Sequence, residues 1–362
     1  MEVEMFDTRI ASVWLAHEGR SDVVYHYGGT RLVDARCSDE EADATVRSLA
    51  SFESAIKNRL INIAVGRLSV ASVPGLHSSR VGGGRCVIRA KTNEFDLILR
   101  DPANPSFTAI ADELFATIGS RLNAMGGILK LTPDFGRFAR VADILHRHTE
   151  HVLGIAREKG GCGGKSSYTA TGVIAALDRL APDTRQAVVV GAAGALGADV
   201  VRELRSRSVE LAVADLAFTD AQPDILPSVP GKFSAECLER GGVVIATTIG
   251  NEFENSDLVR IPSGATFLLA HNNSLPVDRE AAQMLAEQMI RRSIRIVPGQ
   301  LLTFGGALTS RIEYLWRLSS PGRAFDKQLA HSVVRDSTRI IIDYLGELDG
   351  PTLVHALHRA VA

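Results

Sequence analysis

The feature that most constrains the fold is a glycine-rich turn between two apolar segments in the second half of the chain. It lies in "VVVGAAGALGADVVREL", residues 188–204, and a second apolar run, "VELAVAD", follows at 209–215. The order strand, glycine turn, helix, strand is typical of a parallel sheet with helices on both faces. Further apolar runs at 241–250, 264–273 and 293–299 predict more buried strands. We therefore expect an α/β fold with a parallel sheet in this half of the chain.

The spacing of the turn indicates a dinucleotide site. Small residues between a strand and a helix let a pyrophosphate approach the backbone N–H groups at a helix N-terminus. Against the usual G-x-G-x-x-G/A pattern, Ala192 replaces the first glycine. The alternative is a tight turn whose glycines serve only packing. The candidate cofactor-binding residues here are Gly191, Ala192, Gly194, Ala195, Leu196 and Gly197.

Asp215 ends the next strand, 21 residues after Gly194. A carboxylate at that place binds the hydroxyls of the adenosine ribose and disfavours a 2′-phosphate, so we expect NAD as the cofactor rather than NADP. If the turn serves only packing, Asp215 is a solvated strand end.

The first half mixes expected strands and helices. We predict a helix over 38–60 with Ser38 as its N-cap, and helices over 107–127 and 137–154. Strands are expected over 22–29, ending at Gly28 and Gly29, over 85–91, over 95–101 and near 127–132. A polar glycine-rich stretch at 157–167 is the best linker. We therefore expect a first domain over 1–165, a dinucleotide-binding domain over 166–315 and C-terminal helices over 316–362.

The composition argues against two classes of binding partner, nucleic acids and membrane surfaces. Lys plus Arg (40) nearly balance Asp plus Glu (42), which gives a formal net charge of −2 and favours neither nucleic-acid nor membrane-surface binding. The acidic N-terminus lacks a signal-peptide core, and we expect a cytoplasmic protein. The four cysteines are far apart. We expect neither disulfides nor a metal site, although His146, His148 and His151 lie close together in sequence.

Several short segments in one order resemble the amino-acid dehydrogenase family of glutamate, leucine, phenylalanine and valine dehydrogenases, nearest the leucine and phenylalanine branch. They are "GGTRL" (28–32), "VGGGRCVI" (81–88), "LTPDFG" (131–136), "SSYTATGV" (166–173), "ATTIG" (246–250), "AHNNSL" (270–275) and "VPGQLLTFGGAL" (297–308). The resemblance implies an N-terminal substrate and oligomerisation domain, a Rossmann domain that binds NAD, and C-terminal helices that return to the first domain. It also implies a homo-oligomer, dimer or higher, that takes a small carboxylate-bearing substrate in a cleft between the domains.

The same resemblance implies roles for individual residues. Asp134 matches the catalytic aspartate, and Gly28, Gly29 and Thr303 fall on the substrate side, with Thr303 where the family usually has asparagine. Thr169, Thr247 and Asn272 fall on the cofactor side. An N-cap or buried hydroxyl is the alternative for Thr169, and a plain turn for Asn272.

Arg85 stands where the family has a lysine that moves protons. A guanidinium stays protonated in proteins and cannot act as a base at neutral pH, but it can hold an anion through two parallel hydrogen bonds. Three interpretations remain open: Arg85 binds a substrate carboxylate, stabilises an oxyanion in a different hydride transfer, or forms a structural ion pair with Asp134. A second family lysine is also absent, since no lysine lies between 58 and 90. Lys165 is either a replacement cation or a solvated linker residue.

These residues predict an NAD-dependent oxidoreductase that acts at a C–N or C=N bond of a carboxylate-bearing metabolite. Its substrate is expected to differ from those of the family, as in specialised-metabolite biosynthesis. The alternative is a catalytically silent NAD-binding relative that regulates or binds a partner.

Overall fold

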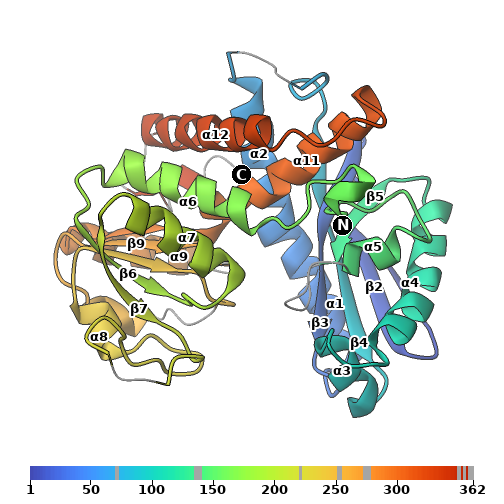
Figure 1. The fold of residues 1–362 in the computed structure, drawn as a ribbon, viewed down its shortest axis with the longest axis horizontal. Helices are drawn as coiled ribbons and strands as arrows, with labels where there is room; N and C mark the ends of the chain where they lie inside the picture. The colour runs from blue at the N-terminus through green and yellow to red at the C-terminus, as the bar shows by residue number, and fades with distance from the viewer. Residues whose placement is uncertain are drawn as a thin grey trace. The chain divides into compact units, whose positions relative to one another are not determined.

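The computed structural model describes residues 1–69, 73–133, 141–219, 222–250, 255–271, 279–348, 352–353 and 356–357. The chain divides into two compact units (Figure 1). Unit 1 comprises residues 1–165 and 307–327, and unit 2 comprises residues 166–306 and 328–362. Among the described residues, every helix is too short or too polar to cross a lipid bilayer.

Unit 1 is built on a mixed five-stranded sheet in the order β1-β2-β4-β3-β5. β3 pairs in parallel with β4 and with β5, whereas β2 pairs antiparallel with β1 and β4. Successive side chains of β4 and of β5 point to opposite faces of this sheet. The strands are β1 (Glu2–Asp7), β2 (Ala11–His17), β3 (Tyr25–Val33), β4 (Val81–Ala90) and β5 (Leu129–Pro133).

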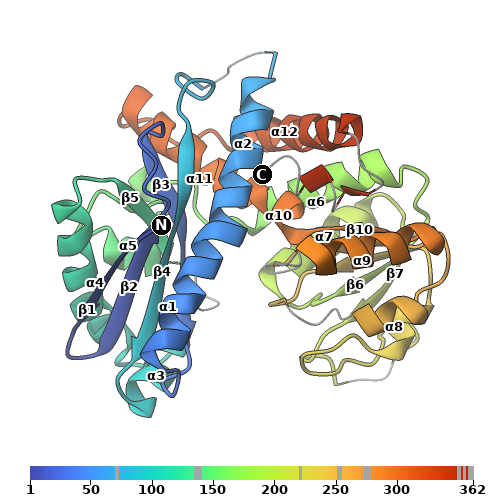
Figure 2. The same ribbon diagram turned by 180° about the vertical axis from the view of Figure 1, so that it is seen from behind.

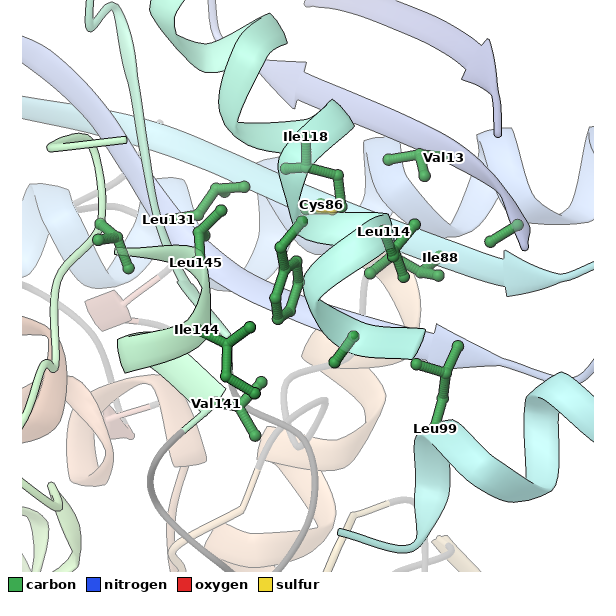
Figure 3. Close-up of a cluster of buried hydrophobic side chains, with 14 of the residues drawn as sticks. Val13, Cys86, Ile88, Leu99, Leu114, Ile118, Leu131, Val141, Ile144 and Leu145 are labelled. Carbon is green, nitrogen blue, oxygen red and sulfur yellow. The ribbon is translucent and has the colours of Figure 1, made fainter. Parts of the chain in front are cut away.

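Helices cover both faces of this sheet (Figures 1 and 2). On one face lie α3 (Asn93–Arg100), α4 (Phe107–Ala124) and α5 (Val141–Leu145), which close a large apolar core (Figure 3). On the other face lie α1 (Asp39–Ser48), the π-helical segment η1 (Leu49–Ala55) and α2 (Ile56–Gly66). Side chains that point away from the α4 core therefore meet η1 and α2.

The first helix begins as predicted. The Ser38 hydroxyl accepts a hydrogen bond from the Glu41 N–H, and the Glu41 side chain accepts one from the Ser38 N–H, which completes a capping box. The helical path then continues through η1 and α2 to Gly66.

Four local predictions in unit 1 are wrong. Residues 95–101 were expected to form a strand, but they lie in and just after α3, which Thr92 caps and in which only Leu99 is fully buried. β3 does not end at Gly28 and Gly29, and β4 starts before its glycines, because neighbouring strands pair through both glycine runs. Of the helix expected over 137–154, the described residues form only α5, since the backbone of 152–153 pairs with Leu131 instead.

Unit 2 contains a five-stranded sheet in the order β10-β9-β8-β6-β7, in which every pair is parallel, as predicted. The strands are β6 (Gln186–Val190), β7 (Glu210–Ala214), β8 (Val243–Ala246), β9 (Thr266–Leu269) and β10 (Arg295–Val297). The chain leaves β6 toward β7 and then returns to β8 on the other side. A crevice at such a switch point is the usual ligand site of open parallel sheets.

Helices again flank this sheet. α7 (Ala195–Ser206) lies in front of it in Figure 1, and α9 (Arg279–Arg291) lies in front of it in Figure 2. The remaining helices of the chain are η2 (Arg157–Lys159), α6 (Ser166–Leu180), α8 (Ala235–Glu239), η3 (Asn255–Val259), α10 (Gly299–Leu302), α11 (Phe304–Ser319) and α12 (Lys327–Glu347).

The C-terminal helices divide differently from the expectation. Residues 307–327, most of α11, belong to unit 1, whereas the chain from residue 328 onward belongs to unit 2. α12 lies along α6 in both views (Figures 1 and 2). Between the two helices, Thr171 Oγ1 lies 2.7 Å from His331 Nδ1, and Arg179 Nε lies 2.6 Å from Asp343 Oδ1. Because its buried face packs on α6, α12 does not belong with the first unit as the sequence suggested.

Candidate active site

Arg85 lies in the middle of β4, on the sheet face that meets η1. Its side chain is 7% exposed, and its Nη1 lies 3.1 Å from the Oε1 of Glu53 in η1. The same carboxylate oxygen accepts a hydrogen bond from Lys57 Nζ at 2.9 Å. Two cations therefore share one buried anion, and the three side chains carry a net charge of +1.

The pKa of Glu53 follows from these neighbours. Burial raises it, but the charges of Arg85 and Lys57 outweigh burial and hold the pKa at about 2. Glu53 is thus a carboxylate at any pH near neutrality. Among the described residues, the buried Nε of Arg85 and Oε2 of Glu53 find no hydrogen-bond partner. The guanidinium therefore retains donor capacity after it has paired with Glu53.

Gly28 and Gly29 adjoin this cluster. A Cβ on Gly29 would lie 3.0 Å from Arg85 Nη1, and one on Gly28 would lie 1.6 Å from the carbonyl oxygen of Gly84. The glycines therefore let the strands and the guanidinium approach closely. Their assignment to the substrate stays a prediction.

Glu53 is the residue that sequence reasoning missed. It stands four residues before Lys57 in the largely apolar segment "LASFESAI" (49–56), and a lone carboxylate on a buried helix face is a signal for a charged partner. Asp134, the other predicted partner of Arg85, lies outside the described residues. The described partner of Arg85 is Glu53.

A second polar group lies on the same sheet face at β5, on the far side of β3 from Arg85. Thr132 of β5 pairs with Gly29 of β3, and its hydroxyl lies 2.8 Å from the Tyr27 hydroxyl. Lys165 Nζ donates to both oxygens, at 2.7 Å to Thr132 and 2.8 Å to Tyr27. The Lys165 side chain is therefore held by two hydroxyl groups of unit 1, and Lys165 is not a solvated linker residue.

The glycine turn of unit 2 joins β6 to the start of α7. Gly191 has φ +82°, and Gly194 is the N-cap of α7. A Cβ on Gly197 would lie 2.1 Å from the Gly191 carbonyl oxygen, so the helix start packs directly on the turn. Ala195 and Leu196 form the first turn of α7, and Ala192 is 6% exposed. The free N–H groups of this helix start suit a diphosphate.

Two predicted cofactor residues hold this turn. The Asp215 carboxylate accepts hydrogen bonds from the Ala193 and Ala217 N–H groups, both at 2.9 Å. The Thr247 hydroxyl lies 2.9 Å from the Val190 carbonyl oxygen and 3.0 Å from that of Gly191. Asp215 is thus held at the turn by two backbone N–H groups.

The other predicted residues are more scattered. Thr169 lies in the first turn of α6 and is 8% exposed. Thr303 follows α10 and donates its hydroxyl proton to the Gly299 carbonyl oxygen at 2.7 Å. Asn272 lies outside the described residues. The roles assigned to all three stay predictions.

The histidines near residue 150 have separate partners. His148 Nε2 lies 3.1 Å from Asp112 Oδ1, and His151 Nδ1 lies 3.4 Å from Lys130 Nζ. Over the parts of the chain that the structure describes, no group of three or more His, Cys, Asp or Glu side chains could hold a metal ion.

Comparisons with known proteins agree with this architecture. The sequence matches no protein-family profile. It is 24% identical over 275 residues to leucine dehydrogenase of Bacillus subtilis (strain 168), a match that covers 71% of this chain and 66% of that protein. The matched stretch is thus just under two thirds of the relative's length.

Solved structures resemble the whole chain. The L-tryptophan dehydrogenase of Nostoc punctiforme superposes with a TM-score of 0.65 at 16% identity and covers 100% of this chain and 94% of its own. The hetero-hexameric glutamate dehydrogenase of Thermus thermophilus, in a leucine-bound form, gives a TM-score of 0.71 at 17% identity over 99% of this chain and 88% of its own. The fold is that of the amino-acid dehydrogenases.

Proposed function

We propose that this chain, which has the fold of the glutamate, leucine, phenylalanine and valine dehydrogenase family and is similar in sequence to a leucine dehydrogenase, is an NAD-dependent oxidoreductase. It acts at a C–N or C=N bond of a small carboxylate-bearing metabolite. The observation that carries the proposal is the buried Arg85, which keeps an unpartnered Nε among the described residues and lies beside Gly29. Such a fixed cation suits a substrate carboxylate.

In this proposal Arg85 binds and orients the carboxylate of the substrate. Glu53 holds the guanidinium in place, and the net charge of +1 on the Arg85, Glu53 and Lys57 group favours an anionic ligand. Of the two ligand interpretations, a carboxylate fits better than an oxyanion that exists only during the reaction, because the cation is permanent. Asp134 is proposed as a proton carrier, and Gly28, Gly29 and Thr303 as further parts of the substrate site.

The glycine turn from Gly191 to Gly197 would hold the diphosphate of NAD, and Asp215 would bind its ribose hydroxyls. The bound nicotinamide supplies the hydride acceptor or donor. Thr169 and Asn272 are proposed to face it. We also propose that the protein works in the cytoplasm as a homo-oligomer, dimer or higher, since one structural relative is a hetero-hexamer.

The loss of lysine at position 85 supports a substrate different from those of leucine or phenylalanine dehydrogenase. A pathway for a specialised metabolite would provide such a substrate. One observation favours the alternative of a catalytically silent NAD-binding relative: the Arg85–Glu53 pair is buried, and a buried pair can be purely structural.

A spectrophotometric screen separates the two functions. The full chain is mixed with NAD and a panel of amino acids, or with NADH, ammonium and the matching 2-oxo acids, and NADH absorbance is followed. We expect turnover of at least one carboxylate-bearing compound, and a loss of about 100-fold or more in kcat/KM for Arg85→Ala because a charge-assisted bidentate contact is removed. NADH binding without turnover across the panel would establish the silent alternative instead.

Asp215 gives a prediction about the choice of cofactor. A carboxylate repels a 2′-phosphate, so Asp215→Asn is expected to tighten NADPH binding relative to NADH by about tenfold or more. The amide keeps one oxygen as an acceptor for the turn. Fluorescence titration with both nucleotides measures the ratio of the two Kd values, and an unchanged ratio would place Asp215 away from the ribose.

A further inference from the structure

The proposed reaction needs a group that gives and takes a proton, and Arg85 cannot do so at neutral pH. We propose that Lys165 carries protons to and from the reacting C–N group, in addition to the role proposed for Asp134. The inference rests on the proposed function and gives Lys165 a proton-transfer role, which goes beyond that of a replacement cation. It depends on where the ε-amine is held.

The register of the sheet places Thr132, a hydrogen-bond partner of Lys165, two strands away from Arg85. Thr132 pairs with Gly29 in β5 and β3, and the Arg85 guanidinium lies against Gly29 from β4. Since neighbouring strands are about 5 Å apart, Thr132 and Arg85 stand on the order of 10 Å apart across one glycine. That distance suits a small amino acid whose carboxylate meets Arg85 while its α-carbon approaches the amine held by Thr132. Gly29 adds no side chain to the sheet surface between Arg85 and Thr132.

Lys165 is built into this place. Its Nζ donates to Thr132 and Tyr27, and the Tyr27 hydroxyl donates in turn to Ser310 at 2.7 Å. The Thr132 hydroxyl donates to the Leu153 carbonyl oxygen at 2.9 Å. Both oxygens therefore have lone pairs directed at the lysine. A Cβ on Gly154 would lie 2.9 Å from Lys165 Cε, so this glycine makes room for the side chain.

The proton balance of the step is simple. Hydride from the α-carbon of the neutral amine would pass to NAD and leave an iminium cation. Water would then add to the iminium carbon: a C–O bond forms, a water O–H bond breaks, the C=N bond becomes single, and neutral Lys165 takes the water proton. The Lys165 ammonium returns that proton to the carbinolamine nitrogen; the C–N bond breaks to release ammonia, and Lys165 takes the hydroxyl proton as the carbonyl forms and passes it to water. No further oxidant is required.

Several titratable or charged groups lie around Lys165. Tyr27 faces it from β3, Cys162 from the preceding loop, and Glu313 of α11 accepts hydrogen bonds from the Gly154 and Cys162 N–H groups. Arg85 lies across Gly29.

Lys130 of β5 is the competing amine of unit 1. Burial, and to a smaller extent the charge of Arg317, lowers the pKa of Lys130 to about 8. However, its Nζ packs over the rings of Tyr25 and Tyr314, and it pairs with Tyr27 rather than Gly29. Lys130 therefore lies two residues along β5 from Thr132, the residue that pairs with Gly29.

The test compares four variants in the full chain with the substrate found by the absorbance screen. Lys165→Arg keeps the positive charge and the hydrogen-bond donors but does not release its proton. Lys165→Met removes the charge and the donors. We expect each to lower kcat by about 100-fold or more while Kd for NADH changes less than twofold. Lys159→Met is the matched control, because Lys159 lies in the same stretch with its side chain 42% exposed, and it should retain wild-type kcat. Lys130→Met should retain the wild-type pH profile.

A chemical rescue separates proton transfer from packing. Lys165→Cys is made together with Cys37→Ser, since the other cysteines are buried, and is alkylated with 2-bromoethylamine. The new side chain is an amine of lower pKa, so activity should return with its alkaline-side profile moved to lower pH. Recovered activity with an unmoved profile, a Lys165→Arg enzyme within threefold of wild type, or a shift caused by Lys130→Met would each overturn the role of Lys165. Wild-type protein that turns over no substrate would overturn the proposed function and this role with it.

Discussion

Replacing Glu53 with alanine is expected to lower the free energy of unfolding by about 3–5 kcal/mol. The substitution leaves the Arg85 guanidinium buried without its carboxylate partner, and a buried charge that loses its partner is among the most costly single changes. Urea or guanidinium unfolding followed by circular dichroism at pH 7 measures the effect. The midpoint of unit 1 should move, and that of unit 2 should not.

An exposed ion pair provides the control. Arg9 and Glu113 are 2.6 Å apart, closer than Arg85 and Glu53, but their side chains are 61% and 47% exposed. Glu113→Ala should therefore cost less than 1 kcal/mol despite the shorter distance. Equal costs for the two alanine variants would show that burial does not decide the strength of the Arg85–Glu53 pair.

The pH dependence of stability tests the same pair. The folded-state pKa of Glu53 is lowered from 4.5 to about 2, so the pair stabilises the fold fully above pH 4.5. That contribution, about 3 kcal/mol, is lost as the pH falls from 4.5 toward 2. In Glu53→Gln the corresponding acid transition should be shallower than in wild type. An identical acid transition in both proteins would mean that Glu53 is not held ionised by its neighbours.

Sequence patterns predicted unit 2 better than unit 1, and the reason is physical. In unit 2 each element follows from local signals: apolar runs form β6 and β8, and Gly191 adopts the left-handed conformation that a tight turn requires. All strand pairs are parallel because helices separate the strands in sequence. The glycine turn between β6 and α7 could therefore be predicted from spacing alone; its role in cofactor binding stays a prediction.

The polar cluster of unit 1 depends on contacts that no local pattern encodes. Glu53 reaches Arg85 across 32 residues, and Lys165 reaches Tyr27 across 138. The sequence indicated that Arg85 needs an anion, but it could not select Glu53 among the available acids. A glycine-rich neighbourhood likewise made Lys165 look like a linker residue, since composition says nothing of the space that Gly154 leaves for it.

Gly197→Ala is expected to weaken NADH binding by about 10- to 100-fold. The added Cβ would lie 2.1 Å from the Gly191 carbonyl oxygen and 2.8 Å from the Ala192 Cα, so the turn and the start of α7 must separate. Overpacking of this kind costs about 1–3 kcal/mol, and here the displaced atoms include the backbone N–H groups that would face the diphosphate. Titration of protein or NADH fluorescence measures the loss.

A second glycine makes the result specific to the turn. Gly346 of α12 has no neighbouring atom within 4 Å of an added Cβ, so Gly346→Ala should bind NADH as wild type does. Acid unfolding of unit 1, which depends on Glu53, should be the same in both glycine variants. If Gly197→Ala bound NADH within threefold of wild type, the diphosphate could not lie on this helix start, and the glycines would serve packing alone. Loss of binding in Gly197→Ala but not in Gly346→Ala assigns the diphosphate to the turn between β6 and α7.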